Sequence, residues 1–150
     1  MPFLQPNHME LKFSSRSENE SLARVAVGAF VSQSNPTMDE ISEIQTVVSE
    51  AVTNAIIHGY EDGGENFVMV TCSINAYEFI LTVEDNGRGI CDIEEARQPL
   101  FTSKPELERS GMGFTIMEEF MDDILITSVP GQGTKVRLSK TLRTAEQAVK

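Results

Sequence analysis

Two β-rich runs that are separated by only two residues constrain the fold of this chain more than any other feature. The runs cover Phe67–Ile74 and Tyr77–Glu84, and Asn75-Ala76 between them predicts a hairpin. Elsewhere the strand and helix patterns do not alternate as βαβ units. The expected architecture is therefore an α/β (α+β) two-layer sandwich, with helices on one face of a mostly antiparallel mixed sheet.

Two capping signatures mark where helices are expected to begin. Ser17 to Glu20 matches a capping box, and Thr37 to Glu40 repeats the pattern before a longer helix that Gly59 is expected to end. The residues expected to face inward are Leu22, Val25, Ala26, Ala29 and Phe30 on the first helix, and Ile41, Ile44, Val48, Ala51, Val52 and Ala55 on the second.

The remaining elements are predicted in the same way. Met9, Leu11 and Phe13 alternate with polar residues, which indicates a first strand. Further along the chain we expect a short helical piece near 92–98, a lid-like loop over 99–112, a helix from about 113 to 121, and strands over 124–129 and 134–139.

Composition places the chain among globular proteins. Its 150 residues, 40% of them hydrophobic, are expected to form a single domain over 1–150, with a leader (1–8) and a tail (141–150) outside the core. A net charge of −11 argues against nucleic acid or an anionic membrane as the main partner. No apolar run approaches the ~20 residues of a membrane span, so the expected location is cytoplasmic. Cys72 and Cys91 lack metal-ligand spacing and are read as reduced thiols.

Glu50 and Asn54 are the first candidate pair for chemistry. They lie four residues apart on the longer helix, so both side chains leave the same face. An amide oxygen together with nucleotide phosphates suits Mg²⁺, and a glutamate one turn earlier suits a general base. The alternative is that both residues, and His58 one turn further on, lie on a solvated helix face.

Asp85 is the second candidate, at the end of a strand. A carboxylate there can accept a hydrogen bond from an exocyclic amine such as that of adenine, and Gly87 and Gly89 let the backbone approach a flat ring. Gly111 and Gly113 open a helix whose N–H groups can hold phosphate. For Asp85 the alternative is that Asp85-Asn86-Gly87 is an ordinary Asp-Asn-Gly turn. Thr134, at the start of the last strand, is placed where a hydroxyl can support Asp85 through water.

These motifs together resemble those of a known superfamily. Glu50–Asn54, Asp85-x-Gly87-x-Gly89, Gly111-x-Gly113 and Gly133-Thr134 look like the N, G1, G2 and terminal G-T boxes of the GHKL ATPases, which use the Bergerat fold. Two longer segments, 49–60 and 97–114, are similar to the anti-sigma serine kinases of endospore formers. The resemblance covers residues from about 9 to 140.

The resemblance implies a role for each motif residue. Asn54 would hold Mg²⁺, and Glu50 would activate the acceptor hydroxyl. The remaining residues divide into an adenine group (Asp85, Gly87, Gly89 and Thr134), a phosphate group (Gly111 and Gly113), Arg109 at the γ-phosphate or a docked partner, and Arg24 as a contact for protein partners.

The resemblance also implies the partners. Family members dimerise, bind a sigma factor in the ATP state, and phosphorylate a serine of an anti-anti-sigma protein, which leaves ADP. The expected function is therefore a sporulation anti-sigma factor and protein-serine kinase. Two alternatives stay open: a general-stress anti-sigma kinase, and an ATP-gated sigma-binding module with little kinase activity. Glu50 favours catalysis, because ATP binding alone needs no base. A self-contained histidine kinase is not expected, since neither His8 nor His58 lies in a phospho-accepting helix pair.

Overall fold

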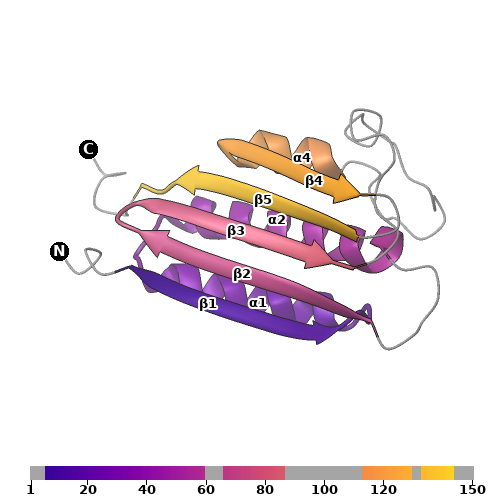
Figure 1. Cartoon of the computed structure of the whole chain (residues 1–150). Coiled ribbons are helices and arrows are strands. Elements are labelled where there is room, and N and C mark those ends of the chain that lie inside the picture. Colours follow the sequence, from indigo (N-terminus) through magenta and orange to yellow (C-terminus); the bar gives the residue numbers. More distant parts are fainter. Residues whose placement is uncertain (1–5, 60–65, 87–112, 130–132, 144–150) are drawn as a thin grey trace.

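The computed structural model describes residues 6–59, 66–86, 113–129 and 133–143 (Figure 1). Its elements, in chain order, are β1 (Asn7–Ser14), α1 (Asn19–Ser32), α2 (Met38–Gly59), β2 (Phe67–Asn75), β3 (Glu78–Asp85), α4 (Gly113–Phe120), β4 (Asp123–Val129) and β5 (Gly133–Thr141).

The strands form one sheet in the order β1-β2-β3-β5-β4, and the helices lie behind it in one layer (Figure 1). The two-layer α+β prediction is confirmed. Each pair of neighbouring strands is antiparallel, so the expected mixed sheet is wrong for the described strands. The hairpin turn lies one residue later than expected. Asn75 still pairs with Glu78, and Ala76 takes the left-handed conformation with φ +55°.

Alternation along the strands separates a buried face from an open one. The side toward the helices carries the fully buried Phe79, Leu81 and Leu138 together with Val68 and Val70. Burial of each such side chain stabilises the fold by about 1.5–3 kcal/mol. Little core was expected beyond residue 140. This expectation is wrong for Leu142, which is only 4% exposed and belongs to the core.

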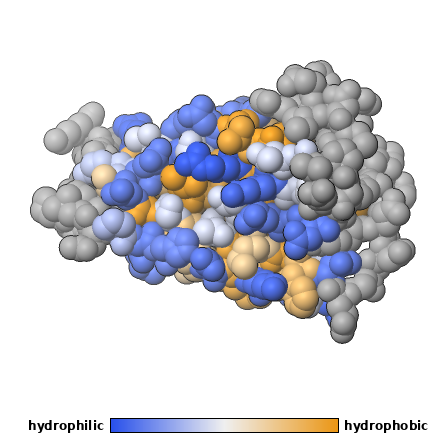
Figure 2. Space-filling model, viewed as in Figure 1, coloured by the Kyte–Doolittle hydropathy of each residue, from blue (hydrophilic) through white to orange (hydrophobic). Residues whose placement is uncertain are grey.

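The other side of the sheet is uncovered and mainly hydrophilic (Figure 2). Lys12, Glu84 and Lys135 stand in one cross-strand row there, among a few exposed apolar side chains such as Phe67 and Leu125. The Lys12 ammonium lies 4.9 Å from the centre of the Phe67 ring, a cation–π contact. The alternating pattern is thus that of a sheet with one face in solvent.

Helix α1 is rotated relative to the sequence prediction. Its buried residues are Glu20, Ala23, Val27, Gly28, Phe30 and Val31, whereas Leu22 and Val25 are 49% and 63% exposed. The cap position also differs from the expected one: Glu18, not Ser17, precedes the first helical residue Asn19, and the Glu18 side chain makes no capping hydrogen bond. The apolar residues of α1 occupy two faces, so their spacing alone was consistent with either face packing inward.

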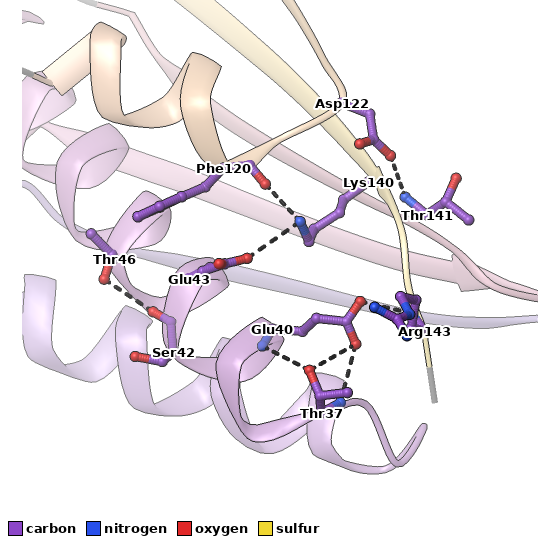
Figure 3. A network of polar contacts seen from close by, with 10 residues as sticks. All are labelled: Thr37, Glu40, Ser42, Glu43, Thr46, Phe120, Asp122, Lys140, Thr141 and Arg143. Atoms are coloured by element: carbon purple, nitrogen blue, oxygen red, sulfur yellow. Dashed lines mark hydrogen bonds and ion pairs between the residues drawn. The ribbon is translucent and has the colours of Figure 1, made fainter. Parts of the chain in front are cut away.

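Helix α2 begins as its sequence predicts. Thr37 Oγ1 accepts the N–H of Glu40 at 3.1 Å, and Glu40 Oε1 accepts the N–H of Thr37 at 3.1 Å, which completes a capping box (Figure 3). The other carboxylate oxygen of Glu40 accepts the N–H of Arg143 at 2.7 Å. The described part of α2 extends to Gly59, the residue expected to end it. No helix in the described parts of the chain is long and apolar enough to cross a membrane.

Candidate nucleotide site

Four elements meet at one end of the molecule, on the right in Figure 1. Helix α2 and strand β3 end there, and α4 and β5 begin there. Helix α2 packs against α4, β3 and β5. Residues that the sequence analysis took from separate motifs are therefore carried to the same end of the fold.

A polar row crosses the helix-covered side of the sheet at this end. Asp85 pairs with Thr134, and Thr134 pairs with Ser128. Asp85 is 8% exposed and Thr134 is 9% exposed. The hydroxyl oxygens of Ser128 and Thr134 lie 3.0 Å apart, and Ser128 Oγ donates to the carbonyl oxygen of Gly133 at 3.2 Å. Thr134 thus lies directly across from Asp85, next to a serine that sequence reasoning missed.

Gly133 is required by the close approach of β3. Its φ of +106° is one that side-chain-bearing residues rarely adopt. A Cβ at this position would lie 2.7 Å from the Cα of Asn86 and closer still to the carbonyl oxygen of Asp85. The glycine therefore permits the pairing that sets Asp85 beside Thr134.

Glu50 and Asn54 lie on the second half of α2 and are both half-buried. Ala51, Val52 and Ala55 beside them are buried in the core. Because Glu50 and Asn54 border this packed face, neither lies on the fully solvated face that the alternative interpretation required.

The other residues that the sequence predicts to bind nucleotide lie partly in described and partly in undescribed parts of the chain. Gly113 is the first residue of α4, as predicted. Gly87, Gly89, Arg109 and Gly111 lie outside the described residues, as do the expected helical piece at 92–98 and the lid at 99–112. For His58 the structure describes the helical backbone only.

A buried carboxylate that sequence reasoning assigned to a cap connects α1 with α2. Glu20 is 7% exposed and accepts a hydrogen bond from Ser49 Oγ at 2.5 Å. Its Oε2 also lies 3.3 Å from Nε of Arg24, whose side chain is 44% exposed. Ser49 directly precedes Glu50. The signal available in the sequence was the i, i+4 spacing of Glu20 and Arg24.

The described residues contain no group of three or more His, Cys, Asp or Glu side chains able to hold a metal ion. Burial raises the pKa of the Cys72 thiol to about 12, so this thiol remains protonated at neutral pH.

Comparison with known proteins shows the family of this chain. Residues 13–140 match the family model described as the histidine kinase-like ATPase domain. The anti-sigma F factor of Bacillus subtilis (strain 168) is 61% identical over 136 residues, which cover 91% of this chain and 93% of that protein. The anti-sigma F factor of Geobacillus kaustophilus is 63% identical over 134 residues, covering 89% and 92%.

A solved structure shows the same fold at much lower identity. The crystal structure of the RsbU and RsbW domains of Rv1364c from Mycobacterium tuberculosis superposes with a TM-score of 0.64 at 20% identity. The superposition covers 92% of this chain and 32% of that one. At this identity the likeness supports the fold alone.

The fold, the polar end of the sheet and the family match define an ATP-binding domain of the histidine kinase-like ATPase class. Within that class the chain belongs to the anti-sigma F factors, which are ATP-dependent serine kinases and sigma-factor inhibitors. The predicted family, function and enzyme class are confirmed at this level.

Proposed function

We propose that this chain binds Mg-ATP where α2, β3, α4 and β5 meet, and transfers the γ-phosphoryl group to a serine of an anti-anti-sigma protein. We further propose that it forms a homodimer and that it inhibits a sporulation sigma factor in its ATP-bound state. Because these partners control transcription in bacteria, the proposed location is the cytoplasm. The observation that carries the nucleotide site is the buried Asp85 beside Thr134 at this end of the sheet.

Asp85 is proposed to recognise adenine. A buried carboxylate accepts hydrogen bonds but donates none, so it favours the exocyclic amine of adenine over the carbonyl of guanine at the same place. Thr134 lies opposite it and contributes a hydroxyl. Gly87 and Gly89 are proposed to border the ring, while Gly111, Gly113 and Arg109 are proposed to hold the phosphates.

Asn54 is proposed to hold Mg²⁺. A neutral amide oxygen is a hard ligand, and Mg²⁺ commonly takes one or two protein ligands together with phosphate oxygens and water. If the ion is bound there, Asn54 would hold it, and its charge would offset that of the phosphates.

Glu50 is proposed to act as the general base toward the acceptor serine. It lies one turn before Asn54 on the same side of α2 and is half-buried. Such a position allows a carboxylate to accept the hydroxyl proton beside the phosphoryl group. General-base catalysis of this kind contributes about 10²–10⁴-fold in rate.

Arg24 is proposed to contact the protein partners. Its guanidinium forms an ion pair with the buried Glu20, and Arg24 Nη2 also donates to Ser21 Oγ at 3.2 Å. Leu22 and Val25 next to it are exposed. An arginine fixed among exposed apolar side chains has the composition of an interface centre.

Phosphoryl transfer tests the proposed reaction. Purified chain, Mg²⁺ and γ-labelled ATP are incubated with a purified anti-anti-sigma protein, or with its variant in which the acceptor serine is alanine. We expect label on the first protein only. Glu50→Gln should abolish labelling and keep ATP affinity, whereas Asp39→Asn, which removes an exposed charge from the same helix, should change neither.

The outcomes separate the candidates. Loss of ATP binding in Glu50→Gln would refute the role of Glu50 as a base. ATP binding by the unmodified chain without any protein label would favour the ATP-gated binding module.

For the partner surface, Arg24→Ala should weaken sigma binding, whereas Arg16→Ala, at another exposed arginine, should not. If Arg24→Ala bound the sigma factor as tightly as the unmodified chain and Arg16→Ala do, Arg24 would not be part of the interface.

A further inference from the structure

A lysine lies where the pattern of β5 requires an apolar side chain. Lys140 pairs with the buried Phe79 of β3, so its side chain leaves the sheet on the side that the helices cover. That side chain is only 13% exposed. Because lysine is almost never buried without a partner, its contacts must account for it.

Lys140 meets the carboxyl end of α4. Its Nζ donates to the carbonyl oxygen of Phe120, the last residue of α4, at 2.7 Å, and lies 3.5 Å from Oε1 of Glu43 on α2 (Figure 3). The last carbonyls of a helix have no partner within it, and the helix dipole makes this end negative. Helix α4 has no basic residue in its own last turn. Lys140 therefore supplies from β5 the cation that α4 itself lacks.

Nearby bonds fix the chain that follows α4. Asp122 donates its N–H to the carbonyl oxygen of Ser139 at 2.9 Å. Its carboxylate accepts the N–H of Thr141 at 2.7 Å, as Figure 3 shows. These bonds attach the segment after α4 to β5. The ammonium of Lys140 adds a direct bond to the helix end itself and an ion pair to α2.

We propose that Lys140 is a positioning residue for the nucleotide phosphates. The inference rests on the proposed function, in which the amino end of α4 at Gly113 lies against them. Helix α4 has only eight residues and is therefore about 12 Å long, so displacement of its carboxyl end also moves its amino end. Glu43, the second partner of Lys140, belongs to the helix that carries Glu50 and Asn54.

Calorimetry with ligands that differ only in their phosphates tests this role. Mg-ADP and adenosine are titrated into the unmodified chain and into Lys140→Met, Lys140→Arg and Lys135→Met. Lys140→Met keeps the aliphatic stem and removes the charge. We expect it to lower Mg-ADP affinity about three- to tenfold while adenosine affinity stays within about twofold. Lys140→Arg should restore most of the loss.

Lys135→Met is the matched control, because Lys135 lies on the same strand but is exposed on the open face of the sheet. It should leave Mg-ADP affinity unchanged. Equal losses for Mg-ADP and adenosine in Lys140→Met, or the same loss in Lys135→Met, would overturn the proposal. If Lys140→Met does not fold, Lys140→Gln, which keeps a donor, takes its place. Its loss of Mg-ADP affinity is then compared with its loss of adenosine affinity in the same way. Failure of the unmodified chain to bind Mg-ADP would instead refute the proposed function, and this inference with it.

Discussion

Adding one methyl group at Gly133 should damage both the fold and the nucleotide site. In Gly133→Ala the new Cβ would meet backbone atoms of Asp85 and Asn86, which cannot rotate away as a side chain can. The φ of +106° adds backbone strain. Strain of this kind costs about 1–3 kcal/mol, and overpacking against a fixed neighbour adds about 1–3 kcal/mol. We therefore expect a loss of about 4 kcal/mol in the free energy of unfolding.

Urea unfolding at low temperature measures this loss, and thermal melting should show a Tm lower by roughly 8–16 °C. Because the clash lies at Asp85, Mg-ADP affinity should also fall under conditions in which the variant is fully folded.

Gly28→Ala is the matched control, since it adds the same methyl group at another buried glycine. There the Cβ would meet the side-chain amide of Gln45, the end of a flexible side chain, whose bond to the Arg24 carbonyl oxygen is 3.4 Å long. Alanine in a helix interior gains about 0.5–1 kcal/mol over glycine. The net change should lie within about 1 kcal/mol of zero. If the two variants lost similar stability, the argument from backbone contact would be refuted.

Three further predictions concern buried polar groups. Asp85→Asn should weaken the binding of Mg-ATP and Mg-ADP together by about 1.5–3 kcal/mol, the value of a hydrogen bond to a charged group. Glu84→Gln, on the open face of the sheet, should leave both affinities unchanged. Undiminished ADP affinity of Asp85→Asn in calorimetry would exclude Asp85 from the pocket. Glu40→Ala should lower the free energy of unfolding by about 2–4 kcal/mol, because the N–H groups of both Thr37 and Arg143 lose their acceptor. Asp39→Ala, in the same turn, should lower it clearly less. Equal urea midpoints for the two variants would contradict this. Since the folded pKa of Cys72 is raised to about 12, the unfolded thiol ionises first as pH rises, so stability should fall above about pH 9, and this fall should be smaller in Cys72→Ala.

The sequence was most informative where structure depends on near neighbours. The alternation of Met9, Leu11 and Phe13 predicts β1, and the Thr37–Glu40 capping box predicts the start of α2, because both signals act within a few residues. The motif residues of the candidate site were identified for the same reason, since Glu50 and Asn54 are neighbours on one helix face. Their proposed roles come from the family resemblance.

Only the tertiary structure decided which of several locally equivalent arrangements is formed. Both faces of α1 are apolar, so its packing on α2 selects Ala23, Val27 and Val31 over Leu22 and Val25. The carboxylate of Glu20 accepts a hydrogen bond from Ser49, 29 residues away on α2. The pairing of Asp85 with Thr134 and the contact of Lys140 with α4 likewise join segments far apart in the chain. Such contacts depend on how the whole core packs, and no local pattern of residues encodes them.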